Sequence, residues 1–129
     1  MKIGIIGTGN IGGALANKLV KAGHDVNVAN SRGVNGVRNF AEQVGTQAVD
    51  IYGATKEQDI IILSVPITAM ENFPQDLFEA IPSNVPVIDT SNYYPGLRDP
   101  NIVDIDNGQV ESLWVSNKIG RKVVKAFNN

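Results

Sequence analysis

Three glycines near the amino terminus stand at a spacing that has a chemical use. Gly7, Gly9 and Gly12 follow a short apolar run, and a helical pattern starts directly after them. The first glycine permits a sharp turn, the second lets the backbone approach a pyrophosphate, and the third lets the helix pack against the strand. Free N–H groups and the helix dipole add an anion site. The pattern favours a bound dinucleotide over a tight turn that binds nothing.

The end of the second predicted strand selects the cofactor. An NAD site usually has a carboxylate about 20 residues past the glycines, where it holds the ribose hydroxyls. Here the position is Asn30, followed by Ser31 and Arg32. Asn30 does not repel a 2′-phosphate, Ser31 can donate a hydroxyl to it, and Arg32 can bind it with two parallel charge-assisted hydrogen bonds. We therefore predict NADP (NADPH) rather than NAD, the alternative being a surface loop with a solvated arginine.

Further candidate cofactor-binding residues stand at the carboxyl ends of the fourth and fifth predicted strands. Ligands of such sheets bind at this edge. After the fourth strand, on the expected nicotinamide side, these are Ser64, Val65 and Pro66. After the fifth strand they are Asp89 and Asn92, and residues 127–129, two of them Asn, close the sixth. Because Asn and Ser also cap turns, a purely structural role for residues 89–92 stays open as an equal alternative.

The composition fits one globular domain and excludes several classes of function. The 129 residues are 43% hydrophobic and 19% charged, with a net charge of −2, which argues against a nucleic-acid or anionic-membrane surface. With no cysteine and one histidine, we expect no disulfide and no metal site. The first strand begins at Lys2, and no apolar run approaches the roughly 18 residues of a membrane span, so we expect a cytoplasmic protein.

Alternating strands and helices must position these residues. Apolar runs predict strands at 3–6, 26–29, 48–52, 59–65, 86–89 and 122–127. Helical spacing predicts helices from Gly12 to Gly23, over 34–44, over 68–81 with an interruption at Pro74, and over 111–119. Thr68 and Glu71 have the spacing of a capping box, and 113–115 are the expected core contacts of the last helix. The fold class is α/β: a doubly wound parallel sheet, a three-layer Rossmann fold with strand order 3-2-1-4-5-6.

Several segments together resemble a known family, and they stand at 7–12, 30–33, 63–66, 89–94 and 124–128. Over essentially its whole length the chain resembles the NADP-binding domain of the deazaflavin-dependent NADP oxidoreductases, the coenzyme F-420 group, and above all their bacterial relatives. The resemblance implies that Thr8, Asn10 and Ile11 surround the pyrophosphate. It also implies that Ser31 and Arg32 hold the 2′-phosphate.

The resemblance further implies direct hydride transfer between NADP(H) and a small-molecule acceptor of the flavin or deazaflavin type. Such a transfer between stacked rings needs proximity and orientation more than a protein acid or base. We name no catalytic residue, because Asp89 is the only carboxylate near the expected site and we do not assign it as a base. The alternatives are a non-catalytic NADP-binding module or redox sensor, and a reductase of a small imine or carbonyl substrate, which would need a proton donor.

The resemblance also implies several dozen further residues after the sixth strand, whose helices would cover the nicotinamide and supply the acceptor site and the dimer contact. This chain ends at Asn129. We therefore expect residues 1–129 to form the NADP-binding domain without the covering segment: either the chain is a truncated product, or a partner supplies the acceptor site. Apolar surface left beside the sixth strand would favour self-association, such as a homodimer.

Overall fold

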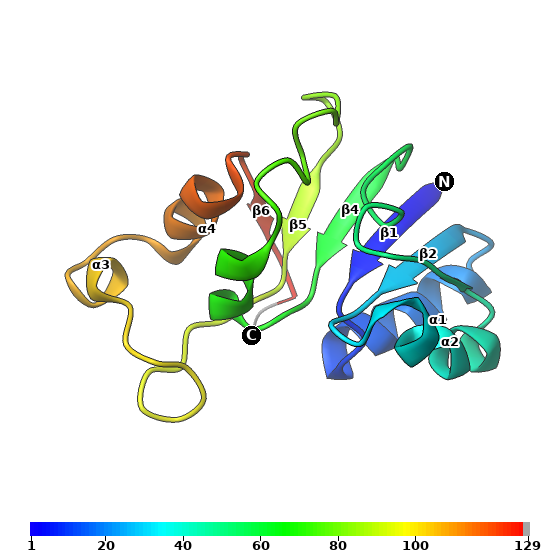
Figure 1. Cartoon of the computed structure of the whole chain (residues 1–129), viewed down its shortest axis with the longest axis horizontal. Helices are drawn as coiled ribbons and strands as arrows, with labels where there is room; N and C mark the ends of the chain where they lie inside the picture. Colours follow the sequence, from blue (N-terminus) through cyan, green and yellow to red (C-terminus); the bar gives the residue numbers. More distant parts are fainter. Residues whose placement is uncertain (128–129) are drawn as a thin grey trace.

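A six-stranded parallel sheet runs through the computed structural model, which describes residues 1–127. Its strands are β1 (Lys2–Ile6), β2 (Asp25–Ala29), β3 (Gln47–Ala48), β4 (Ile60–Leu63), β5 (Val87–Asp89) and β6 (Val124–Lys125). The strand order is β3-β2-β1-β4-β5-β6, and all arrows in Figure 1 point to the same edge of the sheet. The predicted doubly wound Rossmann fold is thereby confirmed.

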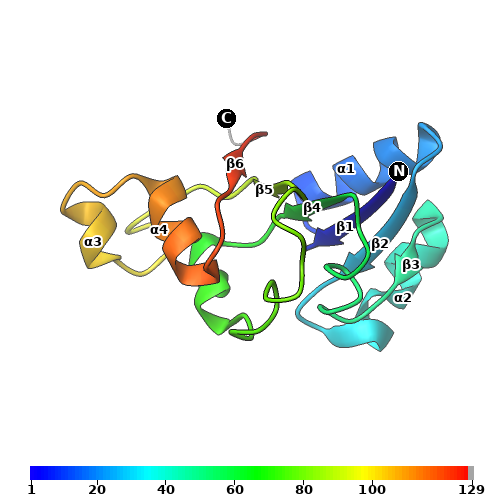
Figure 2. The same ribbon diagram turned by 90° about the horizontal axis from the view of Figure 1, so that it is seen from above.

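Helices cover both faces of the sheet. One face is covered by α1 (Asn10–Lys21) and α2 (Gly33–Val44), and the other by the 3-10 helix η1 (Ile67–Asn72) and α4 (Glu111–Ile119). Figure 2 shows α1 on one side of β1 and β4, and the green η1 on the other. A single turn, α3 (Val103–Asp106), precedes α4. The sequence pattern does not predict this turn.

The central strand β4 belongs to both apolar cores. Ile61 and Leu63 pack with η1 and α4, whereas Ile62 packs with α1 and α2. Its unbroken apolar run therefore does indicate burial on both faces. Each fully buried side chain of this size contributes about 1.5–3 kcal/mol relative to an exposed one.

The connection from β4 to β5 is not the helix that the sequence predicts. Ile67–Asn72 is a 3-10 helix that begins after Pro66, and residues 75–80 form turns. No side chain caps η1, so the predicted capping box at Thr68 is wrong. Pro74 has no N–H to donate and disfavours helix for the residue before it, which stops an α-helix from continuing.

Other expected bounds also change. The edge strands β3 and β6 have two residues each and are shorter than predicted, because each has a hydrogen-bonded neighbour on one side only. Helix α4 has the predicted bounds and ends at the left-handed Gly120, with φ of 71°. Trp114 and Val115 are core residues as predicted, but Leu113 is 52% exposed and the prediction for it is wrong.

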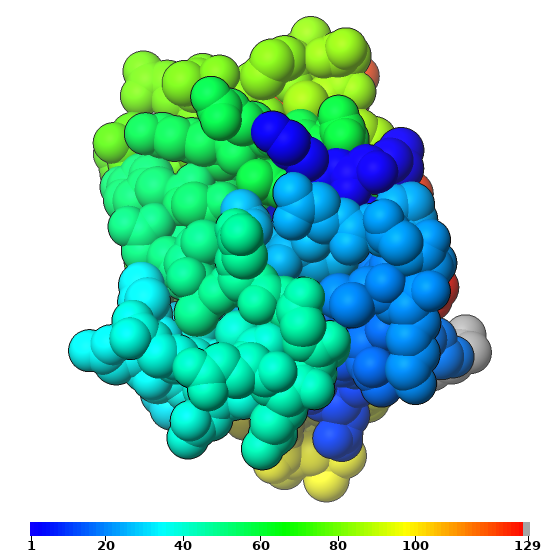
Figure 3. Space-filling model, turned by 90° about the vertical axis from the view of Figure 1, so that its right-hand side faces the viewer, coloured from blue at the N-terminus to red at the C-terminus, as the bar shows by residue number. Residues whose placement is uncertain are grey.

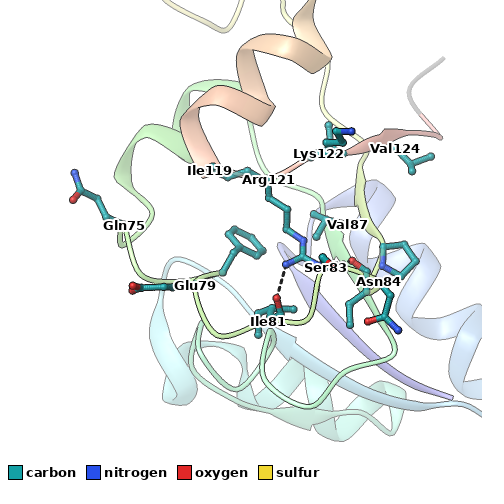
Figure 4. Close-up of a pocket in the computed structure, with 15 residues that line it drawn as sticks. Gln75, Glu79, Ile81, Ser83, Asn84, Val87, Ile119, Arg121, Lys122 and Val124 are labelled. Carbon is teal, nitrogen blue, oxygen red and sulfur yellow. Dashed lines mark hydrogen bonds between the residues drawn. The ribbon is translucent and has the colours of Figure 1, made fainter.

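The side chain of Arg121 links the irregular β4–β5 connection to the turn before β6 through hydrogen bonds. Its Nη1 donates to the Ile81 carbonyl at 2.9 Å, and its Nη2 donates to the carbonyls of Val85, at 2.8 Å, and Pro82. Figure 4 shows the guanidinium reaching from the α4–β6 turn to Ile81. Burial lowers the pKa of Arg121 from its ordinary value. One side chain thus satisfies three carbonyls of a segment with little regular structure.

We expect Arg121→Ala to lower the free energy of unfolding by about 2 kcal/mol, because the three carbonyls lose a charged donor. Chemical denaturation measures this loss. Lys122→Ala, at the exposed neighbouring position, is the matched control and should change the free energy by no more than about 0.5 kcal/mol. Equal effects of the two substitutions would contradict a fastening role for Arg121.

Candidate functional site

The glycine turn lies between β1 and α1, held by the strands on either side. The Gly7 N–H donates to the Ala29 carbonyl at 2.8 Å, and the Ser64 N–H donates to the Ile6 carbonyl at 2.7 Å. Gly7 has a φ of 105°, and a Cβ there would lie 2.0 Å from the Ser64 carbonyl oxygen. A Cβ on Gly12 would lie 2.1 Å from the Gly7 carbonyl oxygen. The fold itself therefore requires glycine at both positions.

Gly9 has no such steric reason to be glycine. A Cβ there would meet no atom within 4 Å, and its φ of −74° and ψ of −156° are extended backbone. The residue is exposed and caps α1, which has no side-chain cap and no acidic residue in its first turn. The open space above Gly9 and the helix N–H groups behind it match what a phosphate group requires.

Asn30 joins the glycine turn to the segment after β2. Its Nδ2 donates to the Thr8 hydroxyl oxygen at 3.1 Å, and its Oδ1 accepts from the backbone N–H of Arg32 at 2.9 Å. An Asn that bonds the backbone two residues onward is a known turn signal in sequences. The bond to Thr8 depends on β1 and β2 being neighbours, so this second role of Asn30 was not predictable from local sequence.

A hollow of about 480 Å³ opens beside the glycine turn. It gathers residues from the ends of β1, β2 and β4. The lining consists of Gly7, Thr8, Gly9, Asn30, Ser31, Arg32, Ser64, Val65, Pro66 and Ala69. All of these except Ala69 are candidates from the sequence. Ser31 and Arg32 are exposed at its rim.

A second hollow, of about 370 Å³, shares Gly9 and residues 64–66 with the first. Its lining is Gly9, Asn10, Ile11, Ser64, Val65, Pro66, Thr90, Ser91, Asn92, Tyr94 and Arg98. In Figure 3 the yellow loop after β5 lies at the same lower end of the molecule as the blue start of α1. The glycine turn thus separates two adjoining hollows at the carboxyl edge of the sheet.

Asp89 and Gly12 are the sequence candidates that line neither hollow. Asp89 is fully buried, accepts from the Ser91 N–H at 2.9 Å, and pairs with the Lys125 ammonium at 3.4 Å. Lys125 also pairs with Glu111 at 3.1 Å. In this structure Asp89 therefore links the segment that follows β5 to β6 through Lys125, and through Lys125 and Glu111 to α4.

Tyr94 and Arg98 line the second hollow without being candidates from the sequence. They lie in the long loop after β5. Tyr94 ends segment 89–94, which carries the family resemblance, but it was given no role there, and no spacing or motif distinguishes Arg98. Ser91 also lines this hollow, and its buried Oγ has no hydrogen-bond partner among residues 1–127. An unpaired buried hydroxyl costs about 1–3 kcal/mol, which a ligand group or water can offset. The polar residues predicted at 128–129 lie outside the described part of the chain.

The proton donors in the two hollows are hydroxyl groups, among them the Tyr94 phenol. Among their described lining residues there is no carboxylate and no imidazole, and the cations are Arg32 and Arg98.

Nowhere in residues 1–127 do three or more His, Cys, Asp or Glu side chains group as metal ligands. Within the same range, no helix has the length and apolar character needed to cross a bilayer.

A larger hollow, of about 840 Å³, lies elsewhere, around Arg121 (Figure 4). Its walls come from the β4–β5 connection and the turn before β6, at the amino edge of β5 and β6. Ligands of open α/β sheets bind at the carboxyl edge, where a topological switch point separates the connections. The smaller pair of hollows at that edge is therefore the better candidate site.

The chain belongs to a known family. Residues 2–93 match the family model described as NADP oxidoreductase coenzyme F420-dependent. The matched stretch contains the glycine turn, residues 30–32 and residues 64–66. This match confirms the resemblance seen in the sequence and makes the chain a member of a family of dinucleotide-binding oxidoreductases.

Solved structures support the same fold. A hypothetical protein from Sinorhizobium meliloti is 31% identical with a TM-score of 0.75, over 99% of this chain and 62% of that one. Prephenate dehydrogenase from A. aeolicus, in complex with hydroxyphenyl propionate and NAD+, is 14% identical with a TM-score of 0.65, over 97% of this chain and 40% of that one. A 3-hydroxyisobutyrate dehydrogenase from Mycobacterium tuberculosis is 19% identical with a TM-score of 0.65, over 96% of this chain and 38% of that one.

The chain thus spans about three-fifths of the length of the Sinorhizobium protein, at 62%. At below 25% identity, the two dehydrogenases are similar in fold alone. None of the curated proteins compared with the chain matches it.

The glycines give a matched pair of substitutions. Gly12→Ala should lower the free energy of unfolding by about 1–3 kcal/mol, because its Cβ collides with the Gly7 carbonyl and the helix must shift. Gly9→Ala should change it by no more than about 0.5 kcal/mol, because the new methyl group enters open space. Urea denaturation of both variants measures the difference. A loss at Gly9 as large as that at Gly12 would show that the fold, not a ligand, requires this glycine.

Proposed function

We propose that the chain binds NADP(H) across the two hollows, as the dinucleotide domain of an NADPH-dependent oxidoreductase. The observation that carries this proposal is Gly9, which the fold does not require, at the junction of the two hollows and at the start of α1. A pyrophosphate at this junction would direct one half of the dinucleotide into each hollow. The unpaired Ser91 hydroxyl in the second hollow supports a polar ligand group there.

The first hollow suits the 2′-phosphate of NADP better than the diol of NAD. Ser31 and Arg32 are exposed at its rim, and no carboxylate lies among its described lining residues. The bond from the Arg32 N–H to Asn30 fixes the backbone at this point. A guanidinium placed there can bind a phosphate through two parallel hydrogen bonds.

When bound, NADPH would supply a hydride, and the second hollow would receive the nicotinamide half. The lining of that hollow orients a ring and offers no carboxylate or imidazole for proton transfer. We favour a flavin-like or deazaflavin acceptor, because such a ring takes the hydride directly, whereas an imine or carbonyl substrate would also need a proton from a hydroxyl such as the Tyr94 phenol. The family to which the chain belongs supports the same choice.

A non-catalytic NADP-binding module or redox sensor is the second candidate. It is supported by the lining of the two hollows, because their described residues include no carboxylate or imidazole and a module that only binds NADPH needs neither. Such a module would bind NADPH with the same residues and would not oxidise it.

NADPH oxidation separates the two candidates. We expect absorbance at about 340 nm to fall when the protein and NADPH are mixed with a flavin or deazaflavin acceptor, because hydride transfer needs only two stacked rings. Gly9→Val, which fills the space above the turn, should abolish both binding and oxidation. Tight NADPH binding without oxidation by any acceptor would favour the module.

Arg32→Ala tests the choice of cofactor. We expect the Kd for NADPH to rise about ten- to 150-fold, equivalent to about 1.5–3 kcal/mol, because a charged hydrogen bond to the 2′-phosphate is lost. The Kd for NADH should hardly change. Titration calorimetry measures both constants, and Arg38→Ala, an exposed arginine on α2, is the control. Equal losses for the two cofactors would rule out a 2′-phosphate contact for Arg32.

A further inference from the structure

We propose that Arg98 determines acceptor specificity in the second hollow, by binding a phosphate or carboxylate carried by a planar electron acceptor. The inference rests on the proposed function, because it takes this hollow to be the place where acceptor and nicotinamide meet. Arg98 is the one charged side chain among its described lining residues. It is 45% exposed, so a ligand in the hollow can reach it.

Arg98 is held in place by a buried carboxylate. Its Nε donates to Oδ1 of Asp99 at 3.1 Å, its Nη2 donates to Oδ2 at 3.0 Å, and Nη2 also donates to the Asn92 carbonyl. The Asp99 side chain is 1% exposed and also accepts from the Tyr94 N–H at 2.9 Å. A side chain fixed by its neighbours loses little entropy when it binds a ligand.

Asp99 is ionised at neutral pH. Burial raises the pKa of its carboxyl, but the hydrogen bonds from Arg98 and the Tyr94 N–H, together with the charge of Arg98, outweigh burial and bring the pKa below its usual value. The carboxylate therefore binds one edge of the guanidinium, through Nε and Nη2. Among residues 1–127 the Nη1 group has no hydrogen-bond partner, and its two N–H donors remain for a ligand.

The surroundings of Arg98 favour an anionic group on a flat molecule. Asp99 pairs with the guanidinium and is not among the residues that line the hollow, whereas the start of α1, at Asn10 and Ile11, lines it and adds positive potential there. The Arg98 guanidinium also lies 5.0 Å from the centre of the half-exposed Tyr94 ring. An aromatic face beside a fixed cation suits a planar acceptor that carries an acidic substituent.

Riboflavin and FMN are matched probes, because they share one ring system and differ by a phosphate. We expect the protein saturated with NADP+ to bind FMN about tenfold more tightly than riboflavin, measured by the quenching of flavin fluorescence. Arg98→Ala should raise the Kd for FMN about tenfold and that for riboflavin less than twofold. In Arg98→Ala the Kd for NADPH should stay within about twofold of the wild-type value. The control Arg38→Ala should leave the Kd values for FMN, riboflavin and NADPH unchanged.

The single substitution leaves Asp99 without its partner, so the double variant Arg98→Ala/Asp99→Asn is measured alongside it. The proposal would be overturned if the wild type bound both flavins with equal affinity. It would also be overturned if Arg98→Ala raised the Kd for FMN and the Kd for riboflavin by the same factor. A tenfold weaker affinity for NADPH would also overturn it, by assigning Arg98 to the cofactor's own phosphates. If NADPH does not bind at all, the proposed function fails, and the flavin pair measured without cofactor still tests Arg98.

Discussion

The close contact between the β1–α1 turn and the end of β4 is the constraint on which the rest of the site depends. Gly7 lies against the Ser64 carbonyl, and Gly12 lies against Gly7, at separations that leave no room for a Cβ. Because both positions are glycine, α1 begins within three residues of β1. Its amino terminus therefore lies at the carboxyl edge of the sheet, between the ends of its neighbouring strands, and the two hollows open on either side of it.

The two hollows differ in how their cations are held. Arg32 is exposed, and its backbone is fixed through Asn30, which in turn bonds to the glycine turn. Arg98 is fixed through its side chain by the buried carboxylate of Asp99. The first arrangement leaves a long side chain free to close on a ligand, whereas the second presents a rigid donor. Such a division suits a site that binds one ligand firmly and selects a second by shape and charge.

The 840 Å³ hollow and the candidate site lie at opposite edges of the sheet. The 840 Å³ hollow around Arg121 exists because the β4–β5 connection is built of turns around Pro74 and Pro82, which pack less regularly than a helix would. Arg121 compensates by binding three carbonyls there. The hollows beside the glycine turn are smaller, but they combine open backbone, a helix amino terminus and polar strand ends, which are features that recognise a ligand.

The sequence by itself determined the strand order, the glycine turn and most of the first hollow, because these follow from local patterns: an apolar run, glycine spacing and the residues that end each strand. Helix 68–81 was mispredicted because helical spacing competes there with prolines, and packing against the sheet decides the outcome. Only the tertiary structure decided that Asp89 is buried against Lys125, that Asn30 reaches Thr8, and that Arg98 joins the second hollow. Each of these contacts joins residues whose distance depends on how the strands and the long loop after β5 pack, and no local spacing encodes that distance.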